Sequence, residues 1–324
     1  MKKNLLFFVP FFLLVGCQMP TLVLEEPTLA EEIVVKGTWQ EGTPLNTERT
    51  EVAATVVGGK IYVVGGFLKG EGTTSTVEVY DPGTGEWSFG KPLPVALDHT
   101  AAVALGGKLY IIGGYQQGWK ESDLVFAYDP ATSVWEEKAK MPTARGALTA
   151  QAIDGKIYAV GGKGEQVYGI VEVYDPEEDA WEKLPTMPTA REHLASGVVD
   201  GKLYVMGGRT RFFAGNLDAH EVFNPVAGDW KSRPALPTKR GGLAAAALGR
   251  KIHVFGGERP TSTFEEHEIY DTLTGVWEQG SPLPTPRHGL TAVTLDNSIH
   301  VVSGGPSPGG SYSNKNEVIS YSFN

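Results

Sequence analysis

Arginine, carboxylate and imidazole side chains recur at one position of a periodic pattern in this chain of 324 residues. Five times an arginine stands ten residues after a tryptophan, and in some copies a carboxylate and a histidine follow it, as in Arg191-Glu192-His193. A guanidinium group binds carboxylates and phosphates through parallel hydrogen bonds, whereas a carboxylate or an imidazole can transfer protons. The pattern could therefore serve the binding of an anionic ligand, acid–base catalysis, or both. The arginines are Arg49, Arg145, Arg191, Arg240 and Arg287.

Two sets of candidate residues follow from this pattern and from nearby loops that differ in length between the copies. Aromatic rings in these loops suit the apolar faces of sugars, and their guanidinium groups suit anions. The predicted binding residues are the five arginines with Tyr115, Trp119, Arg209, Arg211 and Phe212. The candidate catalytic residues, if the protein is an enzyme, are Glu192, His193, Asp98 and His99, with Glu51 as a further carboxylate.

The five arginines also have a structural interpretation, which the sequence leaves open. Glutamates recur at a matched position later in each copy, so each arginine could instead form an ion pair inside the scaffold. These glutamates are Glu78, Glu172, Glu221 and Glu268.

The seven histidines fall into two groups. Three share the arginine-rich position and could in principle bind a metal, but neighbouring arginines disfavour a cation, so we expect no metal and no other cofactor. These three are His99, His193 and His288. We expect the other four to be packing or surface residues, namely His220, His253, His267 and His300.

Short strands in a repeat must position these residues. The run KIYVVGG at 60–66 returns as KLYIIGG at 108–114, KIYAVGG at 156–162 and KLYVMGG at 202–208, with looser copies at 251–257 and 298–305. A strand of small and β-branched residues precedes each run, a strand ending in a Tyr-Asp-Pro-like signal follows it, and a fourth strand starts at the tryptophan. Four short antiparallel strands in each 46 to 49 residues are typical of a β-propeller blade.

The residues that carry this pattern resemble the Kelch repeat. They are Gly-Gly after the second strand, Tyr-Asp-Pro after the third, Trp on the fourth and Pro-x-x-Arg before the first. The resemblance extends from Trp39 to the C-terminus and implies an all-β, six-bladed propeller over residues 37–324, with four antiparallel strands per blade. The last copy has no tryptophan strand after it, and Trp39 has no Tyr-Asp-Pro before it. We therefore expect the strand around Trp39 to complete the C-terminal blade and close the ring.

The N-terminus has the pattern of an export signal. Lys2 and Lys3 precede a mostly apolar stretch over residues 5–15, which is too short to span a bilayer. LVGC at 14–17 resembles the lipobox of bacterial lipoproteins, which implies a signal peptide over residues 1–16, a lipid on Cys17 and a tether over residues 17–36. We expect the protein in the bacterial cell envelope, outside the cytoplasm, with its membrane contact through this lipid alone.

Cysteine content and charge exclude several other classes of protein. Cys17 is the only cysteine, so the folded part can form no disulfide and has no cysteine nucleophile. The formal net charge is −10, which argues against nucleic acid as a partner.

Two functions remain compatible with the sequence. The first is a monomeric, non-catalytic binding module, whose face with the arginines and variable loops binds a glycan, an anionic small molecule or a partner protein. The second is an enzyme. The exported Kelch-type sialic acid mutarotases resemble this chain in compartment and blade count, which implies a mutarotase or epimerase acting on an anionic sugar at the channel mouth. Galactose oxidases, also of Kelch type, need a cysteine joined to a tyrosine, and Cys17 cannot supply it.

Overall fold

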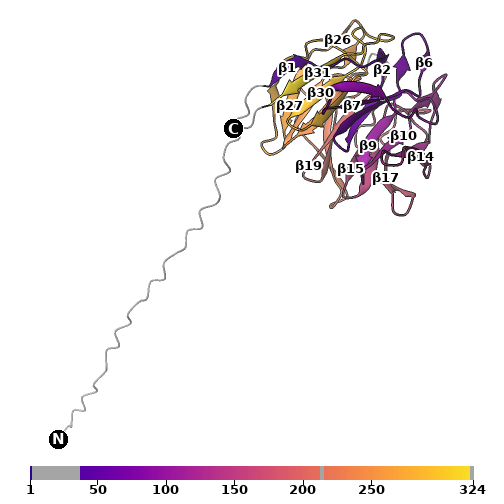
Figure 1. The fold of residues 1–324 in the computed structure, drawn as a ribbon. Helices are drawn as coiled ribbons and strands as arrows, with labels where there is room; N and C mark the ends of the chain where they lie inside the picture. Colours follow the sequence, from indigo (N-terminus) through magenta and orange to yellow (C-terminus); the bar gives the residue numbers. More distant parts are fainter. Residues whose placement is uncertain (2–36, 212–214, 322–324) are drawn as a thin grey trace.

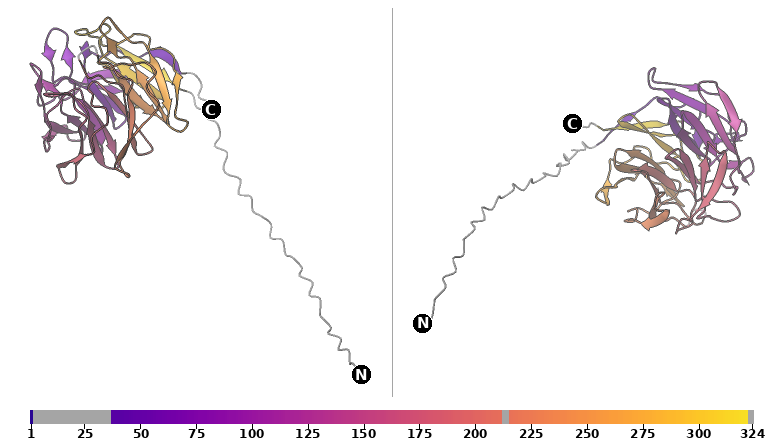
Figure 2. Two further views of the ribbon diagram at one scale, coloured as in Figure 1. Left: turned by 180° about the vertical axis from the view of Figure 1, so that it is seen from behind. Right: turned by 90° about the horizontal axis from the view of Figure 1, so that it is seen from below.

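The computed structural model describes residue 1, residues 37–211 and residues 215–321. These residues form strands and turns without a helix, and so offer no helix that could span a membrane. Six four-stranded antiparallel sheets stand around a central axis as the blades of a propeller (Figures 1 and 2). The predicted all-β, six-bladed fold is thus confirmed. The predicted signal peptide (1–16), Cys17 and the tether (17–36) lie outside the described residues.

Each blade runs from an innermost strand at the axis to an outermost strand at the rim. Blade 1 contains β3 (Ala53–Val57), β4 (Lys60–Val64), β7 (Val77–Asp81) and β8 (Glu86–Phe89), and blade 2 contains β9 (Ala101–Leu105), β10 (Lys108–Ile112), β13 (Val125–Asp129) and β14 (Val134–Glu137). Blade 3 contains β15 (Thr149–Ile153), β16 (Lys156–Val160), β17 (Val171–Asp175) and β18 (Ala180–Leu184), and blade 4 contains β19 (Ala195–Val199), β20 (Lys202–Met206), β21 (His220–Asn224) and β22 (Asp229–Ser232). Blade 5 contains β23 (Ala244–Leu248), β24 (Lys251–Phe255), β27 (His267–Asp271) and β28 (Val276–Gln279), and blade 6 contains β29 (Thr291–Leu295), β30 (Ser298–Val302), β31 (Asn316–Ser320) and β1 (Thr38–Glu41).

Closure of the ring follows the predicted scheme. Strand β1 pairs antiparallel with β31, with Trp39 opposite Ile319, and so supplies the outermost strand of blade 6 (Figure 1). The first described strand and the last therefore share one sheet, and no blade is left with an unmatched face toward a gap.

The recurring spacing of tryptophan and tyrosine from blade to blade has a direct structural cause. In blade 2, Tyr128 of β13 lies opposite Trp135 of β14, with ring centroids 4.8 Å apart, and the same cross-strand pair recurs in blades 1, 3 and 5. The Nε1–H group of each of the six tryptophans on the outermost strands donates a hydrogen bond to a carbonyl oxygen of the neighbouring blade. The donors are Trp39, Trp87, Trp135, Trp181, Trp230 and Trp277, at 2.8–3.3 Å.

The innermost strands consist largely of small residues because six of them crowd around the axis. Strand β23 reads AAAAL and β9 reads AAVAL, for example. Two cavities of about 160 and 330 Å³ lie along the axis between these strands. Both are lined by Ala54, Ala102, Gln151, Ser196, Ala245 and Ala292.

One end of the propeller carries additional short strands, and we call this end the mouth. In blade 2, for example, Tyr115 follows the pair Gly113-Gly114 and lies beside Asp98, which stands just before the innermost strand β9. Gly114 makes this approach feasible, since a Cβ there would lie 2.6 Å from the Asp98 carbonyl oxygen and its φ is +100°. The short strands are β2 (Arg49–Thr50), β5 (Phe67–Leu68), β6 (Gly72–Thr73), β11 (Tyr115–Gln116), β12 (Lys120–Glu121), β25 (Glu258–Arg259) and β26 (Ser262–Thr263).

Candidate functional site at the propeller mouth

The five matched arginines do not line the mouth. Each is fully buried between the strands of its own blade and forms an ion pair with a glutamate of the third strand. A threonine two residues before the arginine donates a hydrogen bond to the same glutamate in every case. The predicted role of these arginines in ligand binding is therefore wrong, because no ligand can reach them. The pairs are Arg49–Glu78, Arg145–Glu172, Arg191–Glu221, Arg240–Glu268 and Arg287–Glu317.

Blade 2 shows that this triad is an architectural element. Leu97 stands where the other blades have arginine, and Phe126 stands where they have glutamate. Val95 replaces the threonine, and all three residues belong to one hydrophobic cluster. An apolar triad thus replaces a polar one as a unit, as expected if each serves to fill and join the blade.

The residues two positions after the matched arginine form a closed ring at the base of the mouth. Each donates its backbone N–H to the carbonyl oxygen of the equivalent residue in the neighbouring blade, at 2.7–3.1 Å, so that six hydrogen bonds encircle the axis. All six residues have φ between 48° and 68°, a left-handed conformation that is uncommon for residues other than glycine. The ring members are Glu51, His99, Ala147, His193, Gly242 and Gly289.

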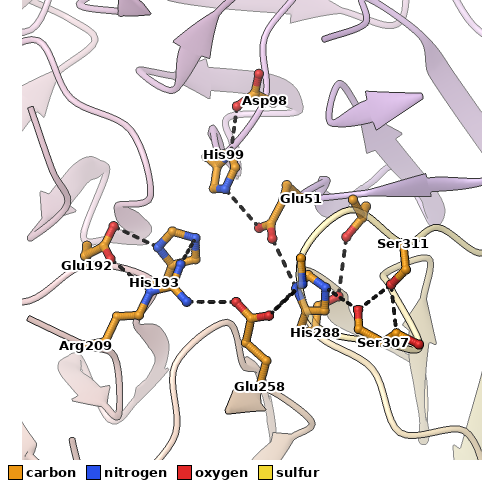
Figure 3. A network of polar contacts seen from close by, with 12 residues as sticks. Glu51, Asp98, His99, Glu192, His193, Arg209, Glu258, His288, Ser307 and Ser311 are labelled. Carbon is orange, nitrogen blue, oxygen red and sulfur yellow. Dashed lines mark hydrogen bonds and ion pairs between the residues drawn. The ribbon is translucent and has the colours of Figure 1, made fainter. Parts of the chain in front are cut away.

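Three of these ring members place polar side chains above the axis (Figure 3). His99 lies between two carboxylates, with Nδ1 2.6 Å from Asp98 Oδ1 and Nε2 3.4 Å from Glu51 Oε2. The Glu51 carboxylate lies over Gly289, where a Cβ would come within 2.6 Å of it. Glycine at this ring position therefore makes room for Glu51.

A second set of contacts continues around the mouth from His193. Its Nδ1 lies 2.9 Å from Glu192 Oε2, and Arg209 donates to its Nε2 at 3.0 Å. Arg209 also donates to Glu192 and to Glu258, at 2.9 and 2.8 Å. His288 completes the network, with Nδ1 3.3 Å from Glu51 and 3.5 Å from Glu258 (Figure 3).

The charges of the network control its protonation. Burial disfavours the ionised form of Glu51, but the imidazoles of His99, His193 and His288 outweigh burial and hold its pKa well below the ordinary value. Burial likewise opposes ionisation of Glu192, whereas His193 and Arg209 lower its pKa to about 2. Burial and then the Arg209 charge lower the pKa of His193. Both glutamates are therefore ionised at neutral pH, while His193 is neutral.

A cavity of about 680 Å³ opens above this network. Its floor is polar, and its wall carries the rings of Phe67, Tyr115, Trp119 and Tyr312. Trp119 is 56% exposed, and its ring lies 5.3–5.5 Å, centroid to centroid, from the rings of His99, Tyr115 and Phe67. This size falls within the usual range for sites that bind small molecules, and the combination of one aromatic wall with a polar floor is suited to an amphipathic ligand.

The other predicted site residues divide between this cavity and its surroundings. Tyr115, Trp119, Arg209, Glu192, His193 and His99 line the cavity, and Asp98 supports His99 from behind. Arg211 is exposed outside the cavity, and Phe212 lies outside the described residues.

Glu258 and His288 are functional candidates that belong to neither the predicted binding residues nor the predicted catalytic residues. Glu258 directly follows its Gly-Gly pair, as Arg209 follows another, so the repeat itself contained the signal. His288 directly follows the buried Arg287, as Glu192 follows Arg191.

The fold and this site define a closed six-bladed propeller with a polar central mouth. The family described as the KLHDC2/KLHL20/DRC7 Kelch-repeats domain matches residues 40–208, just over half of the chain, and the Kelch motif matches residues 190–237. The chain therefore belongs to the Kelch-repeat family. Among solved structures it is similar to the one titled "Structure of YjhT", with a TM-score of 0.74 and 14% identity over 85% of this chain and 95% of that chain. This likeness shows the fold. No match was found among curated proteins.

Proposed function

We propose that the mouth binds a neutral carbohydrate of about one or two sugar units. The observation that carries this proposal is the exposed ring of Trp119 beside the polar floor of the 680 Å³ cavity. An indole ring presents an apolar face on which the C–H face of a sugar can stack. The carboxylates of Glu51, Glu192 and Glu258 offer acceptors for sugar hydroxyl groups, and Arg209 offers donors.

The charge of the network favours a neutral ligand over the anionic ligand that the recurring arginines predict in the sequence. Four carboxylates take part in the network, from Glu51, Asp98, Glu192 and Glu258. Arg209 supplies the guanidinium group of the network, and Glu192 and Glu258 already form ion pairs with it. An acidic sugar would thus meet like charge at the network, with the exposed Lys163 as a further cation that lines the cavity, and this like charge costs binding energy.

Replacing Trp119 with alanine is expected to weaken sugar binding about tenfold, roughly 1.4 kcal/mol, because the stacking surface is lost. Binding is measured from the rise in melting temperature with glucose, galactose, N-acetylglucosamine and cellobiose, beside glucuronate and N-acetylneuraminate as anionic probes. A neutral sugar at about 100 times its dissociation constant should add about 2.7 kcal/mol of stability.

A matched control is Phe89→Ala, which removes an exposed ring from the outermost strand β8 of blade 1. Its affinity for the sugar should equal that of the unaltered protein. A response to anionic sugars alone, or to none of the six, would refute the neutral-sugar proposal.

Catalysis is a second candidate, favoured by the convergence of Glu51, His99, Glu192 and His193 on one cavity. Mutarotation of a sugar needs a group that removes a proton from one oxygen and a group that donates one to another, and carboxylates and imidazoles do both. The rate of anomer exchange of the bound sugar is measured by magnetisation exchange in proton NMR. An accelerated rate in the presence of the protein indicates an enzyme. An unchanged rate of anomer exchange, under conditions in which the protein binds the sugar, indicates a binding module.

We further propose that this mouth acts outside the cytoplasm, on a protein attached to a membrane by lipid on Cys17. The basic N-terminus, the short apolar stretch over residues 5–15 and LVGC at 14–17 support it. A Cys17→Ser variant is expected to leave the membrane fraction, as judged by detergent-free fractionation of cells. Equal membrane retention of both forms would contradict the lipid anchor.

A further inference from the structure

Three histidines of the mouth share an arrangement of their ring nitrogens. One nitrogen of each ring contacts an oxygen acceptor away from the axis: His99 Nδ1 lies 2.6 Å from Asp98, His193 Nδ1 2.9 Å from Glu192, and His288 Nε2 3.1 Å from the Ser307 carbonyl oxygen. With a proton on each of these outer nitrogens, the other nitrogen faces Glu51 in His99 and His288 and faces Arg209 in His193 (Figure 3). Histidines that bind metals are oriented in this way by outer carboxylates or carbonyls.

The inner atoms meet around the Glu51 carboxylate. Its Oε2 lies 3.4 Å from His99 Nε2, and its Oε1 lies 3.3 Å from His288 Nδ1. One ligand atom each from Glu51, His99 and His193 lies within 4.8 Å of the others. Ligand atoms around a tetrahedral zinc ion, with bonds of about 2.0–2.1 Å, lie roughly 3.3 Å apart, so small side-chain rotations would complete such a shell.

The inner nitrogen of His288 supplies an independent observation. This side chain is only 2% exposed, and its Nδ1 makes no hydrogen bond of acceptable geometry. Its nearest polar neighbours are the carboxylates of Glu51 and Glu258, which can only accept when ionised. A buried nitrogen that faces two carboxylates needs a positive charge between them, which is either a proton on Nδ1 or a bound cation in its place.

We propose that Glu51, His99, His193 and His288 bind one divalent transition-metal cation at the base of the mouth. Three imidazole nitrogens and one carboxylate suit Zn²⁺, with Cu²⁺, Ni²⁺ and Fe²⁺ as competitors, and do not suit Mg²⁺ or Ca²⁺, which prefer oxygen ligands. Asp98 and Glu192 orient two of the ligands from outside the coordination shell.

Arginines were the reason to expect no metal, and the structure weakens that reason. The five matched arginines are buried in their own ion pairs, and Arg209 contacts both Glu192 and Glu258. Once the three imidazoles are neutral, as metal binding requires, the four carboxylates of the network and Arg209 carry a net charge of −3, which a divalent cation reduces to −1. On binding, the ion takes the place of Arg209 at His193 Nε2, while Arg209 keeps its two carboxylates.

The test is a titration of the full chain, freed of metal by a chelator, with Co²⁺ alone and no sugar present. Cobalt in a four- or five-coordinate site with nitrogen ligands absorbs visible light far more strongly than hydrated cobalt. We expect a band that saturates at one equivalent and disappears when Zn²⁺ is added. Absence of such a band at one equivalent overturns the proposal, whatever the outcome of the sugar experiments.

Variants identify the ligands. Glu51→Gln removes a ligand and should abolish the band, and Asp98→Asn, which removes only an orienting group, should weaken Co²⁺ binding 10–100-fold. Glu121→Gln removes a rim carboxylate outside the network and should bind Co²⁺ as the unaltered protein does. Circular dichroism without metal identifies a variant that fails to fold. If Glu51→Gln fails to fold, Asp98→Asn alone serves as the test. Equal affinity in all three variants would overturn the assignment.

Discussion

Replacing Arg145 with leucine is expected to lower the free energy of unfolding by about 3–5 kcal/mol, because it leaves a buried carboxylate without its cation. Arg145 and its partner Glu172 have no exposed side-chain surface. The arginine also donates to the carbonyl oxygens of Gly161, Thr143 and Ala159, at 2.9, 2.9 and 3.2 Å. Leucine would leave these acceptors and the Glu172 carboxylate buried, with Thr143 as the remaining hydroxyl donor to Glu172. Urea unfolding followed by tryptophan fluorescence measures the loss.

Blade 2 provides the matched control for this experiment. The triple variant Thr143→Val, Arg145→Leu and Glu172→Phe copies the apolar triad of Val95, Leu97 and Phe126 into blade 3. Buried ion pairs can often be replaced by well-packed apolar groups at no cost in stability. The triple variant should therefore recover most of the stability that Arg145→Leu loses. A triple variant as unstable as the single one would show that the two triads are not interchangeable units.

The sequence contained enough to predict the fold because the repeat fixes it. In blades 1 to 5 the tryptophan of the outermost strand and the aromatic residue seven positions before it are cross-strand neighbours, and this tryptophan also joins two blades. Because no Tyr-Asp-Pro strand precedes Trp39, the sequence predicted that the ring closes through the pairing that β1 and β31 make. Local turn signals, strand pairing and blade contacts all agree, as is typical of a sequence that specifies one fold.

The site was harder to predict because its residues occupy the same repeat as the structural ones. The arginines and the mouth residues are neighbours in sequence, yet Arg191 is enclosed in its blade while Glu192 and His193 face the cavity. Which side chain turns inward depends on the left-handed backbone of the ring, with φ of 50° at His193. Neither the amino-acid composition nor the repeat spacing of the sequence predicts that backbone angle. The joint replacement of arginine and glutamate by Leu97 and Phe126 was visible in the sequence and would have marked the arginines as structural.

Lowering the pH from 7 to 5 should weaken the fold through buried histidines far from the mouth. His220, His253, His267 and His300 are all buried, so of the two expected roles they have the packing one. Burial lowers the pKa of His220 to about 4, with the charges of Arg191 and Arg233 adding to the effect and a hydrogen bond to the Pro234 carbonyl oxygen opposing it. Burial likewise lowers the pKa of His267 to about 4.

The sign follows from proton uptake by the unfolded chain. An unfolded histidine has a pKa near 6.5, so between about pH 6.5 and 4 the unfolded chain binds protons that the folded protein excludes, and stability falls as pH falls. For folded pKa values near 4, each histidine costs about 2 kcal/mol at pH 5, so His220 and His267 together cost about 4 kcal/mol.

A substitution isolates this effect from the carboxylates and from the histidines of the mouth. His220→Phe keeps a ring against Tyr270, whose centroid lies 4.4 Å away, and removes the titrating group. The difference in unfolding free energy between pH 7 and 5, measured in urea, should be about 2 kcal/mol smaller in this variant than in the unaltered protein. Tyr204→Phe alters the same cluster without a group that titrates in this range, and should retain the full difference. An equal pH dependence in His220→Phe and the unaltered protein would mean that His220 is protonated in the folded state, and would place acid sensitivity elsewhere in the propeller.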